Sequence, residues 1–224
     1  MPDAVMIFAA GLGTRMGALT RSLPKPMIPV AGRPLIDHAL AQIDRSETVV
    51  VNLFHHANIL QTHLRLAETE TIVETERLET GGGLRQALPL LGTGPVFTLN
   101  SDAVWTGALA TSQLRAAWNP DRMDALLLLV APQNAHGHTG GGDFLIDEGG
   151  RLRRGPGLIY TGAQIIKTEL LQQIPDRVFS LNLLWDRMLA KGRVFGVAHQ
   201  GQWCDVGRPE SIKIAETLLE THDV

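Results

Sequence analysis

Residues 4–36 read AVMIFAAGLGTRMGALTRSLPKPMIPVAGRPLI, an apolar run followed by closely spaced glycines and then by a series of prolines. The apolar run over 4–10 predicts a buried strand. The small residues and glycines after it let backbone N–H groups approach an anion closely. The stretch therefore predicts a strand that leads directly into a phosphate-binding loop.

Two common phosphate-binding motifs do not fit this loop. A dinucleotide-binding turn requires G-x-G-x-x-G and an immediate helix, but Met16 occupies the third glycine position and Gly17 comes one residue late. Pro24, Pro26 and Pro29 leave little room for that helix. The chain also contains no G-x-x-x-x-G-K-S/T run. From the glycines alone, a plain structural loop remains the competing interpretation.

Two cations beside the loop favour a functional role. Arg15 follows the glycines by two residues, and Lys25 lies between Pro24 and Pro26. Prolines restrict the backbone on both sides of this lysine. A lysine fixed in this way beside a glycine loop is better explained as a phosphate ligand than as a mobile surface side chain.

The rest of the chain alternates between apolar runs and segments of helical period. Such alternation predicts an α/β fold, a Rossmann-like doubly wound, mostly parallel sheet with helices on both faces. The second half adds antiparallel strands, including a hairpin over 141–154 and two strands within 193–206 joined by a Gln-Gly turn. The predicted strands are 48–54, 71–75, 95–100 and 124–132 in the first half and 157–167 in the second. The predicted helices are 34–45, 58–67, 83–88, 108–118, one from a Ser180 cap to Gly192, and one from Pro209 to about Thr221.

Bulk composition excludes several classes of protein. The net charge is −3 and no block of Lys or Arg occurs, so nucleic-acid binding through phosphate neutralisation is not expected. The longest apolar run is far shorter than the ~20 residues that cross a bilayer, so no membrane association is expected. The lone Cys204 cannot form an internal disulfide, and with no signal peptide this predicts a cytoplasmic protein. The sequence does not distinguish a monomer from a homodimer.

The segments AAGLGTRM and PKPMIPVAGRPLI together resemble the signature of the sugar-1-phosphate nucleotidyltransferases, whose pattern is a G-x-G loop with an arginine followed by Pro-Lys. The resemblance covers nearly the whole chain. It implies a nucleotidyltransferase fold in a single domain over 1–224, with a nucleotide-binding part over roughly 1–120 and sugar-binding additions over roughly 121–205. It also implies two substrates, a nucleoside triphosphate and a sugar 1-phosphate.

Two aspartates are candidate ligands for a divalent cation. Asp102 follows the apolar strand FTLN, and Asp205 lies between an apolar strand and a helix start. Each alone is more often a turn or capping residue. Mg²⁺, however, commonly takes one or two carboxylates and completes its shell with phosphates and water. Family members hold their metal in this way, so the resemblance implies Mg²⁺ on Asp102 and Asp205, although Asn100-Ser101-Asp102 departs from the usual G-D or D-x-D form.

The resemblance also implies which residues bind the substrates. The glycines of LETGGG (78–83) are either a flexible helix entrance or a surface against which a base lies flat. Asn182 is equally well explained as a solvated or capping residue. His136 and His138 are better explained as loop residues than as metal ligands, because no third ligand has a suitable spacing. The family's second lysine segment, E-K-P, is absent, and Lys167 and Arg154 are the remaining guesses. The implied nucleotide-binding residues are Ala10, Gly11, Leu12, Gly13, Thr14, Glu79, Thr80, Gly82, Gly83 and Asn100; the implied sugar-binding residues are Asp143, Gly162 and Asn182.

The reaction implied is attack of a sugar 1-phosphate oxygen on the α-phosphorus of the triphosphate. Arg15 would hold the leaving pyrophosphate, and Lys25 the α-phosphate and the incoming phosphate. The LETGGG, GGDF and WCDVG segments resemble the N-acetylmuramate-1-phosphate uridylyltransferases of cell-wall recycling, with mannose-1-phosphate guanylyltransferases or another hexose-1-phosphate nucleotidyltransferase as the alternative. A non-catalytic sugar-nucleotide sensor and an NAD(P) oxidoreductase are more remote, because the charged set is present and Met16 breaks the dinucleotide motif.

Overall fold

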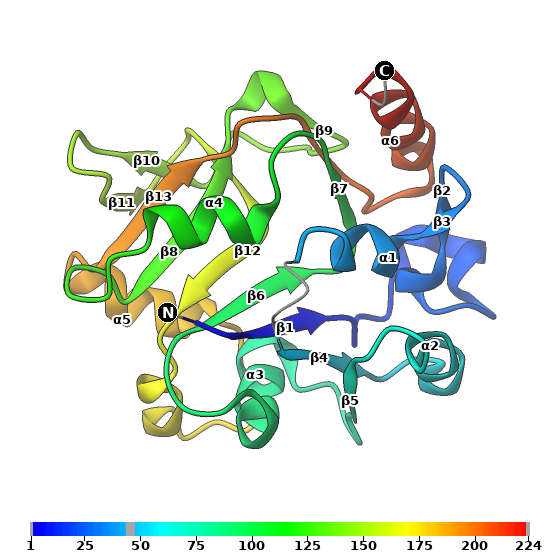
Figure 1. The fold of residues 1–224 in the computed structure, drawn as a ribbon, viewed down its shortest axis with the longest axis horizontal. Coiled ribbons are helices and arrows are strands. Elements are labelled where there is room, and N and C mark those ends of the chain that lie inside the picture. The colour runs from blue at the N-terminus through cyan, green and yellow to red at the C-terminus, as the bar shows by residue number, and fades with distance from the viewer. Residues whose placement is uncertain (1, 44–47, 223–224) are drawn as a thin grey trace.

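A seven-stranded sheet forms the centre of the computed structural model, which describes residues 2–43 and 48–222 (Figure 1). The strand order across the sheet is β13-β8-β12-β6-β1-β4-β5. The strands span Ala4–Phe8 (β1), Thr48–Leu53 (β4), Glu70–Val73 (β5), Val96–Asn100 (β6), Ala125–Val130 (β8), Ile159–Ile166 (β12) and Val194–Ala198 (β13).

All strands of this sheet except β12 run in one direction. β1 pairs in parallel with β4 and β6, β4 with β5, and β8 with β13. β12 is antiparallel to both of its neighbours, β6 and β8. The predicted mostly parallel α/β sheet is therefore confirmed, and its antiparallel strand lies inside the sheet rather than at an edge.

Helices cover both faces of the sheet because alternate side chains of each strand point to opposite faces. Val5 and Ile7 of β1 pack in one core with three helices, whereas Met6 packs in the other core with two. Side chains of the central strands β1, β6, β8 and β12 are mostly buried, as expected for a sheet covered on both faces, whereas the edge strand β5 is more exposed. The helices of the first face are α1 (Leu35–Leu40), α2 (Ala57–Leu64) and α4 (Ala110–Ala117); those of the second are α3 (Glu79–Leu91) and α5 (Asn182–Ala190).

Smaller sheets lie beyond the main one. β7 (Ala103–Trp105) follows β6 and pairs antiparallel with β14 (Trp203–Asp205), which also pairs with β9 (Ala135–His136). A third apolar core lies between this sheet and α6 (Pro209–His222). β10 (Phe144–Ile146) and β11 (Leu152–Arg154) form the predicted hairpin, and β2 (Pro29–Val30) pairs with β3 (Arg33–Pro34).

Four local predictions need correction or comment. The helix predicted over 83–88 begins at Glu79, so the glycines lie inside it. α5 begins at Asn182 with Leu181 at the N-cap, although the Ser180 hydroxyl still accepts a hydrogen bond from the Asn182 N–H at 3.2 Å. The two strands predicted as antiparallel additions within 193–206 belong to different sheets, and β13 is parallel to its neighbour β8, because the chain crosses from the sheet edge to the ends of the central strands. The helix predicted over 34–45 ends at Leu40, and its last two positions lie outside the described residues.

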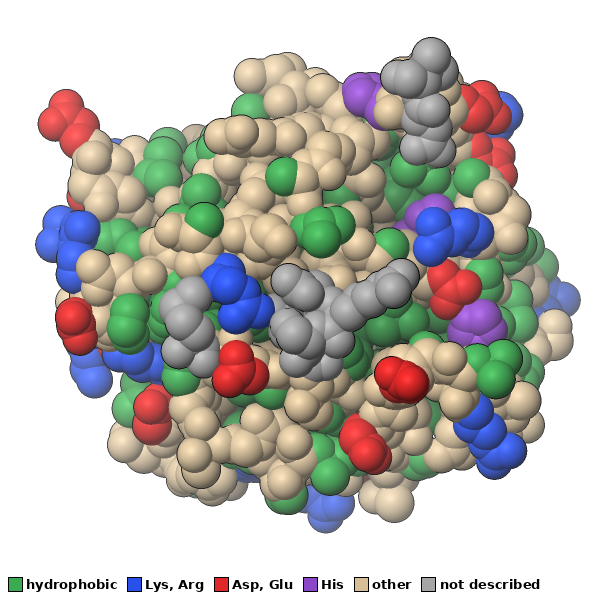
Figure 2. All heavy atoms as spheres, viewed as in Figure 1, with side chains coloured by type: hydrophobic (Ala, Val, Ile, Leu, Met, Phe, Trp, Pro, Cys, Tyr) green, Lys and Arg blue, Asp and Glu red, His purple; other side chains and the backbone are tan. Residues whose placement is uncertain are grey.

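Lys, Arg, Asp and Glu side chains are interspersed on the face shown in Figure 2. In the part of the chain that the structure describes, no helix has both the length and the apolar composition that crossing a membrane requires.

Candidate active site

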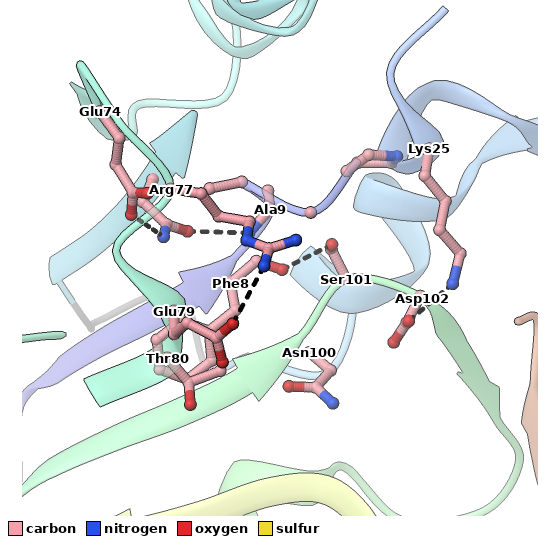
Figure 3. Close-up of a pocket in the computed structure, with 14 residues that line it drawn as sticks. Phe8, Ala9, Lys25, Glu74, Arg77, Glu79, Thr80, Asn100, Ser101 and Asp102 are labelled. Carbon is pink, nitrogen blue, oxygen red and sulfur yellow. Dashed lines mark hydrogen bonds and ion pairs between the residues drawn. The ribbon is translucent and has the colours of Figure 1, made fainter. Parts of the chain in front are cut away.

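A pocket of about 250 Å³ lies where β1, β4 and β6 end (Figure 3). These strands are parallel neighbours, so their carboxyl ends meet at one edge of the sheet, where α/β proteins usually bind ligands. Ser101, which follows β6, donates a hydrogen bond from its hydroxyl to the Phe8 carbonyl at 2.7 Å and ties two of the strand ends together. Of the implied nucleotide-binding residues, Ala10, Gly11, Glu79, Thr80 and Asn100 line this pocket, as do Lys25 and Asp102.

The glycine loop follows β1 and turns sharply at Gly13. Gly13 has a φ of +62°, and a Cβ there would lie 2.9 Å from both Lys25 Cβ and Thr20 Cγ2. A side chain at this position would therefore be strained and would displace Lys25. A short 3₁₀ helix, Thr14–Thr20, follows in place of the long helix of a dinucleotide fold. Leu12, Gly13 and Thr14 continue away from the pocket and do not line it.

Lys25 reaches the pocket from a 3₁₀ turn, Lys25–Met27, that Pro24 and Pro26 restrict. The lysine is 8% exposed, and its Nζ donates to Asp102 Oδ2 at 2.7 Å. Figure 3 shows the two side chains pointing toward each other at the edge of the pocket. This charge-assisted hydrogen bond, which the sequence did not predict, holds the lysine in one position.

Asp205 lies beside Asp102 although about a hundred residues separate them. In the β7–β14 pair Asp205 is opposite Ala103, and the Val206 N–H donates to the Asp102 carbonyl at 2.8 Å. Burial raises the pKa of Asp205 above its usual value, and the Asp102 carboxylate raises it further. Lys25 and Arg15 act in the opposite direction. The structure therefore brings together the four charged residues that the sequence singled out.

Arg15 approaches Asp205 across Gly207. A Cβ at Gly207 would lie 2.9 Å from Asp205 Oδ2 and 3.1 Å from Arg15 Nη1, so both charged groups press against this glycine. Arg15 itself is exposed. Its guanidinium is therefore open to an anion from solvent.

The two carboxylates of Asp102 and Asp205 fit Mg²⁺ better than a metal ion whose ligands all come from protein side chains. Among the described residues, no group of three or more His, Cys, Asp or Glu side chains is arranged to hold a metal ion. Two neighbouring carboxylates, one of them destabilised by burial, do fit an ion that takes its remaining ligands from phosphates and water. His136 instead contacts Gln202, with His136 Nε2 lying 2.9 Å from Gln202 Oε1.

A buried polar network lies at the opposite end of the pocket, and the sequence analysis missed it. Asn52 Oδ1 accepts the Ala9 N–H at 2.8 Å, and Asn52 Nδ2 donates to Glu74 Oε1 at 2.6 Å. Glu74 Oε2 accepts the Leu78 N–H at 3.1 Å. A Cβ at Gly83 would lie 2.8 Å from Glu74 Oε1, so this glycine makes room for the network. The sequence signal that could have indicated this network is Asn52, a polar residue inside the otherwise apolar, buried strand β4.

The first turn of α3 gives its glycines a packing role. The N–H groups of Gly81 and Gly82 both donate to the Phe179 carbonyl, at 2.9 and 3.1 Å. A Cβ at Gly81 would overlap the Phe179 ring, and one at Gly82 would lie 2.5 Å from the Arg177 carbonyl. Protein atoms thus fill the space beside these glycines, and neither Gly82 nor Gly83 is among the described residues that line the pocket at the strand ends.

Glu79 at the start of α3 has a strained backbone conformation, and the effect of this strain on the free energy of unfolding can be tested by substitution. Its φ is +62°, a conformation that disfavours residues with a Cβ. Glu79→Gly is expected to raise the free energy of unfolding by about 0.5–1 kcal/mol, because relief of strain outweighs the entropy that glycine adds to the unfolded chain. Chemical denaturation measures this change. Thr75→Gly, at an exposed neighbour without positive φ, is expected to destabilise; a loss of stability in both variants would contradict the interpretation.

A second pocket of about 430 Å³ adjoins the first and shares Phe8, Thr80 and Asn100 with it. Asp143 and Asn182, implied above as sugar-binding residues, line it. Its apolar wall consists of aromatic rings packed edge to face; the Trp185 ring centroid lies 5.0 Å from that of Tyr160 and 5.9 Å from that of Phe144.

Gly162 does not line this second pocket but shapes it. It lies at a bulge in β12 with a φ of +88°, and a Cβ there would lie 2.8 Å from Asn100 Cβ. Of the two guessed cations, Arg154 lines the second pocket, whereas Lys167 pairs with Asp124, with Nζ 3.1 Å from Oδ1.

Known proteins resemble this chain in sequence and in fold. The model of the MobA-like NTP transferase domain matches residues 5–148. The chain is 41% identical to an N-acetylmuramate alpha-1-phosphate uridylyltransferase of Caulobacter vibrioides, covering 97% of both chains. It is 31% identical to the protein of the same name from Neisseria meningitidis, covering 95% of this chain and 96% of that one.

Solved structures show the same fold at lower identity. HddC from Yersinia pseudotuberculosis, complexed with GMP-PN, has a TM-score of 0.75 at 22% identity, covering 97% of this chain and 99% of that one. The inositol-1-phosphate CTP transferase from T. maritima also has a TM-score of 0.75, at 15% identity, covering 98% and 97%. The chain therefore belongs to the MobA-like NTP transferase family, among its sugar-1-phosphate nucleotidyltransferases.

Proposed function

We propose that this protein transfers a uridylyl group from UTP to N-acetylmuramate 1-phosphate, which gives UDP-N-acetylmuramate and pyrophosphate. The observation that carries the proposal is the likeness, over nearly the full length of both chains, to two proteins named for this activity. The convergence of Arg15, Lys25, Asp102 and Asp205 beside a pocket at the strand ends supports it. A sensor without catalysis would not need this charged set.

Catalysis in this proposal depends on positioning and on neutralisation of charge. The attacking phosphate is already anionic near neutral pH, so no general base is required. Lys25, held at the pocket by Asp102, contacts the α-phosphate and the incoming phosphate, and Arg15 contacts the leaving pyrophosphate. Preorganised cations of this kind stabilise the charge that develops during in-line displacement.

Mg²⁺ is the proposed cofactor, since nucleotidyltransferases of this family generally depend on a divalent metal. Asp102 and Asp205 would hold it. When bound, it supplies Lewis-acid stabilisation of charge on the phosphate oxygens. Lys25 already pairs with Asp102 in the structure, with Nζ 2.7 Å from Oδ2.

The substrates divide between the two adjoining pockets. We assign the nucleotide to the first pocket, near the loop that includes Leu12, Gly13 and Thr14 and the start of α3 with Gly82 and Gly83. The sugar is assigned to the second pocket, near Asp143, Gly162 and Asn182. One domain over 1–224 would thus consist of a nucleotide part over roughly 1–120 and a sugar part over roughly 121–205, the second pocket also taking residues from the first part.

A matrix of substrates tests the function. Purified protein is mixed with each common triphosphate and a panel of sugar 1-phosphates in the presence of Mg²⁺, and pyrophosphate release is measured. Release is expected with UTP and N-acetylmuramate 1-phosphate. Release with GTP and mannose 1-phosphate alone would overturn the substrate assignment but keep the reaction class, and no release with any pair would contradict both.

A further inference from the structure

Arg154 is the one Lys or Arg among the described residues that line the second pocket. It ends β11, directly opposite Phe144 in the hairpin, and its guanidinium carbon lies 5.7 Å from the centroid of the Phe144 ring. Asp143, the one carboxylate that the described part of the chain contributes to this pocket, accepts the Tyr160 N–H on Oδ2 at 2.8 Å. The pocket thus offers one carboxylate that suits hydroxyls and one cation that suits an anion.

Two residues of α5 hold this guanidinium in place. Arg154 Nε and Nη2 donate to Asp186 Oδ1 at 3.1 and 2.8 Å, and Nη2 also donates to Asn182 Oδ1 at 3.0 Å. These bonds use three of the five N–H hydrogens of the guanidinium. Within the described chain, the two hydrogens on Nη1 have no acceptor. An oriented arginine with two free donors is therefore available on the wall of the pocket.

The pocket wall also explains what kind of anion fits. A planar guanidinium matches a carboxylate in shape and charge better than a lysine does. The phosphate of a sugar 1-phosphate is already accounted for by Lys25 in the proposed function. N-acetylmuramate carries a second anion, the carboxylate of its lactyl ether, which glucosamine and hexose 1-phosphates lack. The wall beside Arg154 is aromatic and suits the apolar parts of such a sugar.

We propose that Arg154 binds the lactyl carboxylate of N-acetylmuramate 1-phosphate and selects this sugar over sugars without a carboxylate. The inference rests on the proposed function. Asp186 and Asn182 act as positioning residues, because they contact the arginine and fix its plane. The Arg154–Asp186 ion pair is itself about half exposed, with side chains 45% and 57% accessible, so it contributes little to folding. Loss of Arg154 is therefore expected to change substrate binding rather than stability.

The test compares N-acetylmuramate 1-phosphate with its amide, in which the lactyl carboxylate is a neutral carboxamide. With UTP and the wild-type protein, kcat/KM is expected to be about 10–100-fold higher for the acid, the range for a charge-assisted hydrogen bond. Arg154→Gln is expected to raise KM for the acid by a similar factor, to leave KM for UTP unchanged, and to remove the preference for acid over amide. Arg153→Gln, at the exposed neighbouring position, is the matched control and keeps the preference.

The outcomes separate this inference from the proposed function. Equal wild-type activity on acid and amide, or an Arg154→Gln protein that keeps the wild-type preference, would overturn the role of Arg154 and leave the proposed function intact. A wild-type protein that neither turns over nor binds N-acetylmuramate 1-phosphate, measured by calorimetry, would overturn both. The wild-type comparison needs no variant, so it holds even where a substitution affects folding.

Discussion

Lys25→Ala is expected to lower kcat by about 10²–10³-fold, the usual effect of removing one preorganised charge from a site where charge develops. Lys25 Nζ lies 2.7 Å from Asp102 Oδ2, and the residue is 8% exposed. Its charge therefore acts in a region with little water, where an electrostatic contact is stronger than at the surface. Since the lysine contacts both reacting phosphates in the proposed mechanism, its loss affects the transition state more than binding.

Lys25→Arg is expected to rescue little of this loss. A guanidinium is larger and planar, and it presents its donors in a fixed fork rather than from one compact ammonium. Gly13 packs closely against the stem of Lys25, since a Cβ at Gly13 would lie 2.9 Å from Lys25 Cβ. The loop therefore has little room for a wider side chain in the same place.

Steady-state kinetics with UTP and N-acetylmuramate 1-phosphate at saturation measures this effect, and circular dichroism confirms that the variant folds. Lys213→Ala is the control, because its side chain is 76% exposed on α6 and its nearest carboxylate oxygen lies 3.9 Å away. A Lys25→Ala protein with wild-type kcat would show that Lys25 does not act in the reaction.

Local patterns were enough to predict most of the sheet. Strand residues such as Val5, Met6 and Ile7 are buried on both faces, so the sequence shows a continuous apolar run rather than an alternating one. Strand position was harder to predict. β12 belongs to the second half, whose strands were expected to be antiparallel, but only its tertiary partners β6 and β8 place it inside the sheet.

Chain crossings were also invisible to local patterns. The segment over 193–206 has the apolar content of two strands and a turn between them, which predicts a hairpin. In the structure β13 extends the main sheet, whereas β14 pairs with β7 and β9. Because β14 pairs with β7, Asp205 lies beside Asp102. The chain crossing that local patterns did not predict is therefore also what brings the charged residues together.

The charged cluster was predictable because each member has its own local signal, such as a glycine loop, a proline frame or a strand end. The contacts between its members were not. The Lys25–Asp102 ion pair joins residues 77 positions apart and depends on the direction of two side chains. The hydrogen bond between Asn52 and Glu74 was equally hard to predict, since each is a single polar residue whose partner lies on another strand or loop. The role of Gly81 likewise depends on the distant Phe179.

Asp205→Asn is expected to lower kcat by about 10²–10³-fold and to weaken binding of a divalent cation to the complex with nucleotide. The substitution keeps the shape of the side chain and removes its charge, so the fold around β14 is expected to survive. Asp205 lies beside the Asp102 carboxylate, and burial together with Asp102 raises the pKa of Asp205 more than Lys25 and Arg15 lower it. A dication between the two carboxylates would stabilise the charged form of Asp205, and a neutral asparagine would lose most of this attraction.

Two readouts are needed because activity alone does not separate metal binding from a structural effect. Electron paramagnetic resonance with Mn²⁺ and UTP measures how much ion is bound, and kinetics across Mg²⁺ concentrations measures how much is required. Asp121→Asn, at an exposed carboxylate in a different part of the molecule, is the matched control. Unchanged Mn²⁺ binding together with a large fall in kcat would show that Asp205 is not a metal ligand. The fall would then be explained by loss of the interaction of Asp205 with Arg15, the exposed cation that lies with it beside Gly207.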